Sequence, residues 1–191
     1  MPILNLKGEQ IVLQPMRYRD RAQWNHVRNE NRDWLTPWEA TLPKIPGESP
    51  ANLKPHSRPS FYEMVRAHRS EATAGRSYSF LIWHGKNLVG QITMGGVMYG
   101  ALRGGHIGYW IDKNFANRGM TTEAVKLLTE FGFDQLGLHR IEINIRPENE
   151  ASCRVAEKAG YEFEGYRKAY LHIDGAWRDH KCFVRNNELI Q

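Results

Sequence analysis

The chain has 191 residues, of which 41% are hydrophobic and 25% charged, as in an ordinary globular domain. No apolar run reaches the roughly 20 residues needed to cross a bilayer, and the first ten residues lack a signal-peptide pattern, so we expect a cytoplasmic protein. The net charge of +5 suits an anionic ligand, although a basic surface without a partner would give the same value. Cys153 and Cys182 lack metal-ligand spacing and no dense Lys/Arg run is present, so neither a metal nor a nucleic acid is expected.

The N-terminal part is predicted to alternate strands and helices. A first strand is expected around residues 11–13 and should end at Pro15, and Asp20 is placed to cap a helix over about residues 21–31. Residues 34–40 then bring two tryptophans around a proline. Such tryptophans either pack in a core or form one wall of a binding cleft.

Five prolines interrupt residues 41–59, so this stretch cannot form a continuous helix or a central strand. We expect a long loop, inserted within a single domain that spans residues 1–191. A helix over residues 61–69 should follow, and then a hairpin of two strands at 79–83 and 88–94.

A strand, a basic loop and a helix are predicted next to one another in the C-terminal half. Residues 106–111 form the strand, and residues 120–136 form a helix that ends at Gly137. The first turn of a helix has unpaired amides and a partial positive charge, Arg118 adds a full charge, and Gly119 lets a ligand approach the backbone closely. The loop is therefore either a phosphate or pyrophosphate site or an ordinary turn between strand and helix.

Strict alternation of isoleucine with polar residues predicts a half-buried strand over residues 140–146. Asn149 should cap a helix over residues 150–159, with Ser152 completing the cap, and an Asp-Gly turn at 174–175 predicts a closing hairpin. Several antiparallel hairpins with one strand–helix–strand crossover favour an α+β fold, in which helices flank a mixed sheet.

Two stretches carry a specific resemblance, GYWIDKNFANRGMTTEA at 108–124 and HRIEINIRPENEASCRVAEKAGYEFEG at 139–165. They are similar to the GCN5-related N-acetyltransferase (GNAT) superfamily. Residues 31–40 and 170–180 resemble the branch that acetylates ribosomal-protein alanine, on small-subunit protein S5, and the likeness runs over nearly all of the chain. It implies the GNAT fold, with a mostly antiparallel sheet in which two parallel strands splay apart, and acetyl-CoA as the co-substrate in the gap.

The resemblance also assigns residues to the cofactor. Backbone groups of the predicted strand at 106–111 would bond its pantetheine arm. The family's pyrophosphate loop maps onto residues 116–121, where Ala116 and Thr121 depart from the pattern while Arg118 and Gly119 remain. The predicted cofactor-binding residues are Trp110, Ile111, Asn117, Arg118, Gly119, Met120, Thr121, Thr122, Asn149 and Ser152.

Acetyl transfer to an amine needs a general base for the amine and a donor to the leaving thiolate. The family's tyrosine acid falls at Ala156, so Ser152 is predicted to serve the thiolate, with Tyr170 in reserve. The family's frequent carboxylate falls at Asn144, which cannot take a proton. The base is left open among Glu39, Glu142 and His106.

The predicted acceptor is the N-terminal alanine of a ribosomal protein resembling S5, and the ribosome itself is a candidate partner. It would lie between residues 34–40 and the closing hairpin, in a groove that Tyr170, His172 and Trp177 could line. Two alternatives stay open. One is a small-molecule amine as acceptor, and the other is an inactive CoA-binding or ribosome-associated module, as Ala116, Asn144 and Ala156 would allow.

Overall fold

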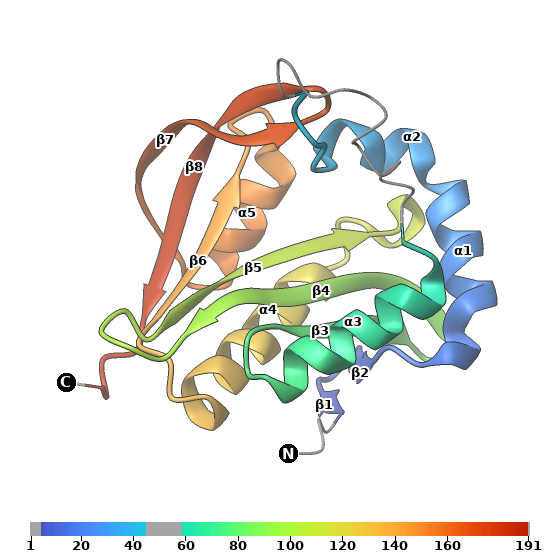
Figure 1. Ribbon diagram of the computed structural model, residues 1–191, viewed down its shortest axis with the longest axis horizontal. Coiled ribbons are helices and arrows are strands. Elements are labelled where there is room, and N and C mark those ends of the chain that lie inside the picture. Colours follow the sequence, from blue (N-terminus) through green and yellow to red (C-terminus); the bar gives the residue numbers. More distant parts are fainter. Residues whose placement is uncertain (1–4, 45–58, 191) are drawn as a thin grey trace.

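The computed structural model describes residues 5–44 and 59–190. Within these residues, eight strands form one sheet in the order β1-β2-β3-β4-β5-β6-β8-β7, with helices on both faces (Figure 1). The strands are β1 (Leu6–Lys7), β2 (Val12–Pro15), β3 (Tyr78–His84), β4 (Asn87–Met98), β5 (Gly104–Ile111), β6 (Arg140–Ile145), β7 (Glu162–Ile173) and β8 (Ala176–Asn186). The α-helices are α1 (Arg21–Glu30), α2 (Arg32–Leu35), α3 (Phe61–Thr73), α4 (Met120–Glu130) and α5 (Glu150–Lys158). This mostly antiparallel sheet between helices confirms the predicted fold class.

Two hydrophobic clusters hold the helices against the sheet. On one face, Leu128 of α4 and Ala156 of α5 are fully buried in a cluster with Ile141 of β6. On the other face, Val65 of α3 is fully buried with Leu81 of β3. Complete burial of one such valine or leucine side chain contributes about 1.5–3 kcal/mol, so both helical layers are anchored through the sheet.

The two parallel strands pair over only a short stretch. β5 and β6 are in register at Gly104↔Arg140, Gly105↔Ile141 and His106↔Glu142. Beyond these positions the strands diverge, β6 rising and β5 running to the right in Figure 1, and α5 lies beside β6. The predicted splayed pair is therefore present. The second half of β5 has no strand partner on the side of this wedge, so backbone groups there are available to a ligand.

Several predicted elements have different ends. The helix expected over residues 120–136 is α-helical to Glu130 and continues as a π-helical turn at Phe131–Gln135, which contains the poor helix former Gly132. Asp20 does not cap α1. Its Oδ2 accepts a hydrogen bond from the Arg17 amide at 2.8 Å instead, because it completes a preceding 3₁₀ turn.

The segment after α2 is joined to the end of β7. Ala40 forms an isolated antiparallel bridge with Ile173, and the Thr41 amide donates to the His172 carbonyl at 2.8 Å. Residues 45–58, most of the predicted proline-rich loop at 41–59, lie outside the described residues. No helix in the described part of the chain is long and apolar enough to span a membrane.

Candidate active site

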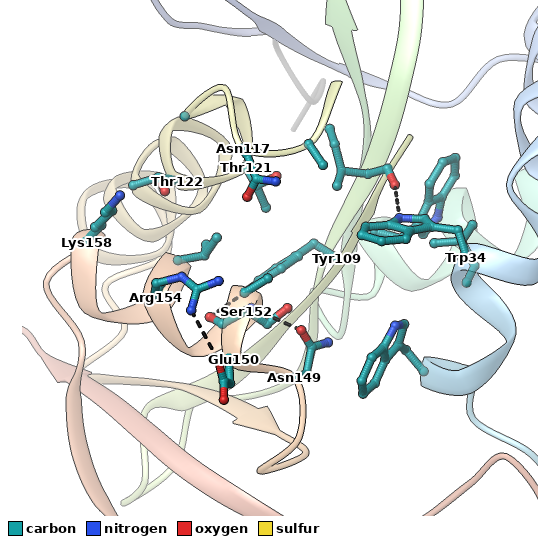
Figure 2. A pocket seen from close by; sticks show the side chains of 18 of the residues that line it. Trp34, Tyr109, Asn117, Thr121, Thr122, Asn149, Glu150, Ser152, Arg154 and Lys158 are labelled. Carbon is teal, nitrogen blue, oxygen red and sulfur yellow. Dashed lines mark hydrogen bonds and ion pairs between the residues drawn. The ribbon is translucent and has the colours of Figure 1, made fainter. Parts of the chain in front are cut away.

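The wedge between β5 and β6 opens into two cavities. The larger, about 470 Å³, lies between the start of α4, one face of α5 and the region around α2 (Figure 2). The smaller, about 260 Å³, lies between β5, β6 and the hairpin of β7 and β8. Both cavities are lined by Trp38, Tyr109, Asn149 and Ser152. They therefore meet at the wedge, and a group held in one is close to a group held in the other.

The start of α4 presents backbone amides to the larger cavity. Gly119 precedes the helix in a left-handed conformation, with φ of +81°, and no side chain caps the first turn. Asn117 is also left-handed, with φ of +60°, and it lines the cavity together with Thr121 and Thr122 (Figure 2). The first amides of a helix have no partner within the helix and attract anions. The predicted phosphate loop thus borders a cavity with the geometry of an anion site.

Two residues of that loop are placed differently from the expectation. The Arg118 guanidinium lies over the Phe115 ring, 5.2 Å from its centroid, and Arg118 is not among the residues that line the described cavity. Met120 is buried in the core, at 3% exposure, and is not among the residues that line the described cavity. Arg154 and Lys158 of α5 do line the cavity (Figure 2), and the sequence analysis missed them. Their i, i+4 spacing, which places both on one helix face, was the available signal.

The backbone groups of Trp110 on β5 point in the opposite direction from those of Tyr109 and Ile111. A Cβ added at Gly90 of β4 would clash with the Trp110 carbonyl oxygen, so this carbonyl is directed toward β4. Because backbone groups alternate in direction along a strand, those of Tyr109 and Ile111 face the wedge. The expectation for Ile111 is thus compatible with the structure, whereas the Trp110 carbonyl faces β4, although Trp110 is among the residues that line the cavity. The Ile111 carbonyl accepts a hydrogen bond from Trp34 Nε1 at 3.1 Å.

Ser152 lies where the cavities meet. Its amide donates to Asn149 Oδ1 at 3.1 Å, which confirms the predicted cap of α5. Its carbonyl accepts from the Tyr109 hydroxyl at 3.3 Å. Burial raises the pKa of Tyr109 above its usual value, so the phenol keeps its proton. The Ser152 hydroxyl has no hydrogen-bond partner among the described residues and is available to a ligand.

The carboxylates considered as bases are held in ion pairs. Glu142 contacts Arg140 at 2.9 Å and Arg167 at 2.7 Å. Burial alone would raise the pKa of Glu142, but the two guanidinium groups outweigh burial and lower the pKa. Glu39 forms an ion pair with Arg28 of α1. Neither carboxylate is among the residues lining the described cavities.

The remaining predicted catalytic residues also lie outside the cavity walls described here. His106 is exposed at the end of the paired stretch of β5. The Tyr170 hydroxyl accepts from Arg167 Nη1 at 3.1 Å, and the Tyr170 ring is in edge contact with the His180 ring, with centroids 5.8 Å apart. Neither His106 nor Tyr170 lines either described cavity, whereas His180 lines the smaller one.

The smaller cavity lies where the acceptor groove was predicted. The Asp174 amide donates to the Glu39 carbonyl at 3.1 Å, so the segment at 34–40 and the closing hairpin are neighbours, as expected. Tyr170, His172 and Trp177 are not among the residues that line the described cavity, however. The lining residues from the hairpin are Leu171, Ile173 and His180. An irregular register between Arg167 and Leu171 determines which side chains of β7 turn inward, and no local pattern in the sequence shows it.

Within residues 5–44 and 59–190, no group of three or more His, Cys, Asp or Glu side chains is placed to hold a metal ion. The two cysteines, Cys153 and Cys182, are buried free thiols.

The comparisons with known proteins agree with this geometry. The family model described as "Acetyltransferase (GNAT) domain" matches residues 10–162. The chain is 31% identical to a probable N-acetyltransferase, YjcK, of Bacillus subtilis, over 94% of this chain and 95% of the relative. It is 27% identical to the [ribosomal protein uS5]-alanine N-acetyltransferase of Escherichia coli, over 94% and 89%. A solved structure of Mycobacterium smegmatis RimJ in complex with CoA-disulfide is similar, with a TM-score of 0.81 and 36% identity over 94% and 83% of the chains.

Three observations identify the family. The family model matches most of the chain, one relative is above 30% identical over nearly its whole length, and the sheet contains the expected splayed strands. The chain belongs to the GNAT acetyltransferase family and is an N-acetyltransferase.

Proposed function

We propose that this enzyme acetylates the N-terminal α-amino group of alanine on a ribosomal protein of the uS5 type, with acetyl-CoA as donor. The observation that carries the proposal is the meeting of two cavities at Ser152 and Tyr109. A donor in the larger cavity and an amine in the smaller one would face each other across the wedge. Such an arrangement suits direct transfer, without an acyl-enzyme.

The larger cavity fits the donor. Amides at the start of α4 suit a diphosphate, and Arg154 and Lys158 add positive charge on the facing helix. The backbone groups of Tyr109 and the amide of Ile111, whose carbonyl already accepts from Trp34, suit an extended amide-bearing arm. Acetyl-CoA supplies the activated thioester. The RimJ structure from Mycobacterium smegmatis contains a CoA-disulfide, which supports the same use here.

Ser152 and Tyr109 are suited to the leaving group. The free Ser152 hydroxyl at the junction can donate a hydrogen bond to a developing thiolate. The Tyr109 phenol stays protonated and holds the Ser152 carbonyl, so it fixes the position of the first turn of α5.

The smaller cavity fits a small side chain beside the amine. Its walls include Ile107, Ile143, Ile145 and Ile173, with Trp38 at the junction. A volume of about 260 Å³ with these isoleucine walls accommodates an alanine methyl group and the start of a peptide. The Escherichia coli relative named for uS5 alanine supports this acceptor, which would place the enzyme in the cytoplasm near ribosomes.

The test compares acceptors with purified protein and labelled acetyl-CoA. One peptide carries a uS5-type N-terminus that begins with alanine, a second replaces the alanine by leucine, and a third has its α-amino group blocked. A panel of small amines is assayed in parallel. Mass spectrometry locates the acetyl group.

Acetylation of the alanine peptide at its α-nitrogen, with at least about a tenfold lower kcat/KM for leucine, is the expected result, since a few methylene groups in an apolar pocket discriminate by this much. Transfer to small amines but to neither peptide would contradict the proposed acceptor. Binding of acetyl-CoA without transfer to any acceptor, the intact ribosomal protein included, would indicate an inactive module.

A further inference from the structure

His180 of β8 is a buried histidine that the sequence analysis did not consider. It is 2% exposed and lines the smaller cavity. Its Nδ1 lies 3.0 Å from the Arg178 carbonyl oxygen. A carbonyl only accepts, so Nδ1 carries the proton, and Nε2 of the neutral ring holds a lone pair. Among the described residues, Nε2 has no hydrogen-bond partner.

Asn144 of β6 is a second unsatisfied group in the same cavity. Its Oδ1 is buried and has no hydrogen-bond partner among the described residues. Leaving such an acceptor unpaired is unfavourable, and a bound donor would offset that cost. Asn144 is in register with Cys182 of β8, two residues from His180. Side chains two residues apart on a strand share a face, so Asn144 and His180 are diagonal neighbours on one face of the sheet.

We propose that Asn144 Oδ1 and His180 Nε2 form the amine site of this enzyme, the amide oxygen orienting the acceptor ammonium and the imidazole removing its proton. This inference rests on acetyl transfer to an amine. It does not depend on which amine is the natural acceptor.

The proton balance is simple. The ammonium donates one N–H to Asn144 Oδ1 and passes one proton to His180 Nε2, which leaves a neutral amine and an imidazolium. The amine nitrogen forms a bond to the carbonyl carbon of the acetyl thioester, and the carbon–sulfur bond breaks. The nitrogen then gives its second proton to the departing thiolate by way of the Ser152 hydroxyl, which ends unchanged, and the imidazolium later returns its proton to water. No oxidant or further reactant is needed.

The surroundings of His180 keep the ring neutral. Burial lowers the pKa of His180, and Arg146, which directly follows β6, lowers it further. The hydrogen bond to the Arg178 carbonyl, Asp179 on the same strand and Glu148 after β6 oppose this, but the net shift is downward. On β7 the Tyr170 ring meets the imidazole edge-on. A base that works at neutral pH must be unprotonated there, and this environment provides such a base.

The first test measures the ring directly. Two-bond ¹H–¹⁵N spectra of the wild-type protein, with and without CoA, report the tautomer and titration of His180, which is assigned through its contact with the Tyr170 ring. We expect a proton on Nδ1 and titration below pH 6.5. A proton on Nε2, or titration above 6.5, would overturn the proposal. This measurement needs no acceptor, so it stands apart from failure of the uS5-type peptide as a substrate.

The second test is kinetic and uses whichever amine the wild type acetylates. His180→Gln should lower kcat/KM at pH 7 by about 100-fold or more, the usual share of a general base. Its activity should recover as pH rises toward the pKa of that amine, which is about 8 for an α-amine. Acetyl-CoA binding should be unchanged. His68→Gln is the matched control, because burial also lowers the pKa of His68, on α3, outside both described cavities. His180→Gln within threefold of the wild type, with the same pH profile, would overturn the assignment.

Asn144→Leu separates orientation from proton removal. It should raise KM for the amine about tenfold, as loss of one hydrogen bond to a charged group does. KM for acetyl-CoA and the acid limb of the pH profile should stay as in the wild type. An unchanged KM for the amine would remove Asn144 from the site.

Discussion

The two cavities at the wedge are built in different ways. The larger one takes much of its wall from consecutive residues at the start of α4 and from one face of α5. The smaller one is lined by residues from five parts of the chain: the segment after α2, β5, β6, the start of α5 and the β7–β8 hairpin. Donor recognition therefore depends mainly on backbone geometry, whereas acceptor recognition depends on side chains that only the complete sheet brings together. Substitutions in the two regions should affect different kinetic constants.

The largest effect is expected at Gly119. Gly119→Glu forces a residue with a Cβ into a left-handed conformation, at a cost of about 1–2 kcal/mol, and places a carboxylate where a diphosphate would lie. We expect acetyl-CoA binding to weaken more than 100-fold in isothermal titration calorimetry. Gly85→Glu is the control, because Gly85 is also left-handed, with φ of +59°, but lies in the turn between β3 and β4. Equal losses in both variants would show that strain, rather than the anion site, explains the result.

The next largest effect is expected where the cavities meet. Ser152→Ala removes the free hydroxyl while the backbone cap by Asn149 remains, so turnover should fall about 10- to 100-fold and acetyl-CoA binding should be kept. Pre-steady-state measurement of acetyl transfer distinguishes the chemical step from product release. Ser70→Ala, at an exposed site on α3, should behave as the wild type. Unchanged turnover in Ser152→Ala would leave the thiolate to another donor.

A smaller effect is expected on the charged face of α5. Arg154→Ala and Lys158→Ala should each weaken acetyl-CoA binding about three- to tenfold, and more at low salt than at high salt, because both are surface charges. Lys126→Ala removes an exposed charge from α4 outside the described cavity and is the control. Losses that do not change with salt would mean that these side chains act by packing rather than by charge.

The difference between the two cavities also explains which features could be predicted from the sequence. Short local sequence patterns predict the two wedge strands, the cap by Asn149 and the glycine before α4. The structure contains all of them. Arg154 and Lys158 could have been found from their helical spacing. The backbone direction of Trp110 could not, because it depends on the register between β4 and β5.

The residues of the acceptor cavity could not be predicted from local sequence patterns, because the order and register of the strands bring them together. His180 reaches the smaller cavity because β8 lies between β6 and β7, an order that the chain sequence does not show. The irregular pairing near Leu171 then turns that residue inward and leaves Tyr170 beside His180. Glu142 looked like a suitable base on its strand, yet folding places Arg140 and Arg167 against it.

Glu142 gives the last prediction, in which stability should change more than catalysis. The carboxylate joins β6 to Arg167 of β7 and is only 17% exposed, so Glu142→Gln should lower the free energy of unfolding at pH 7 by about 1–2 kcal/mol. Its folded pKa is depressed, so this stabilisation is present above the unfolded value of about 4.3 and is lost as pH falls through the folded pKa. Urea unfolding at pH 7, 5 and 3 should show the difference from the wild type shrinking toward acid.

Glu71→Gln is the matched control for this pair, because Glu71 contacts Arg76 at 2.7 Å with both side chains largely exposed, and its loss should matter less. Turnover of Glu142→Gln should stay within a few-fold of the wild type if the amine site belongs to Asn144 and His180. A 100-fold loss of turnover at unchanged stability would make Glu142 the base. The acceptor side would then depend on a strand carboxylate that the sequence alone had identified, and the contrast between the two cavities would largely disappear.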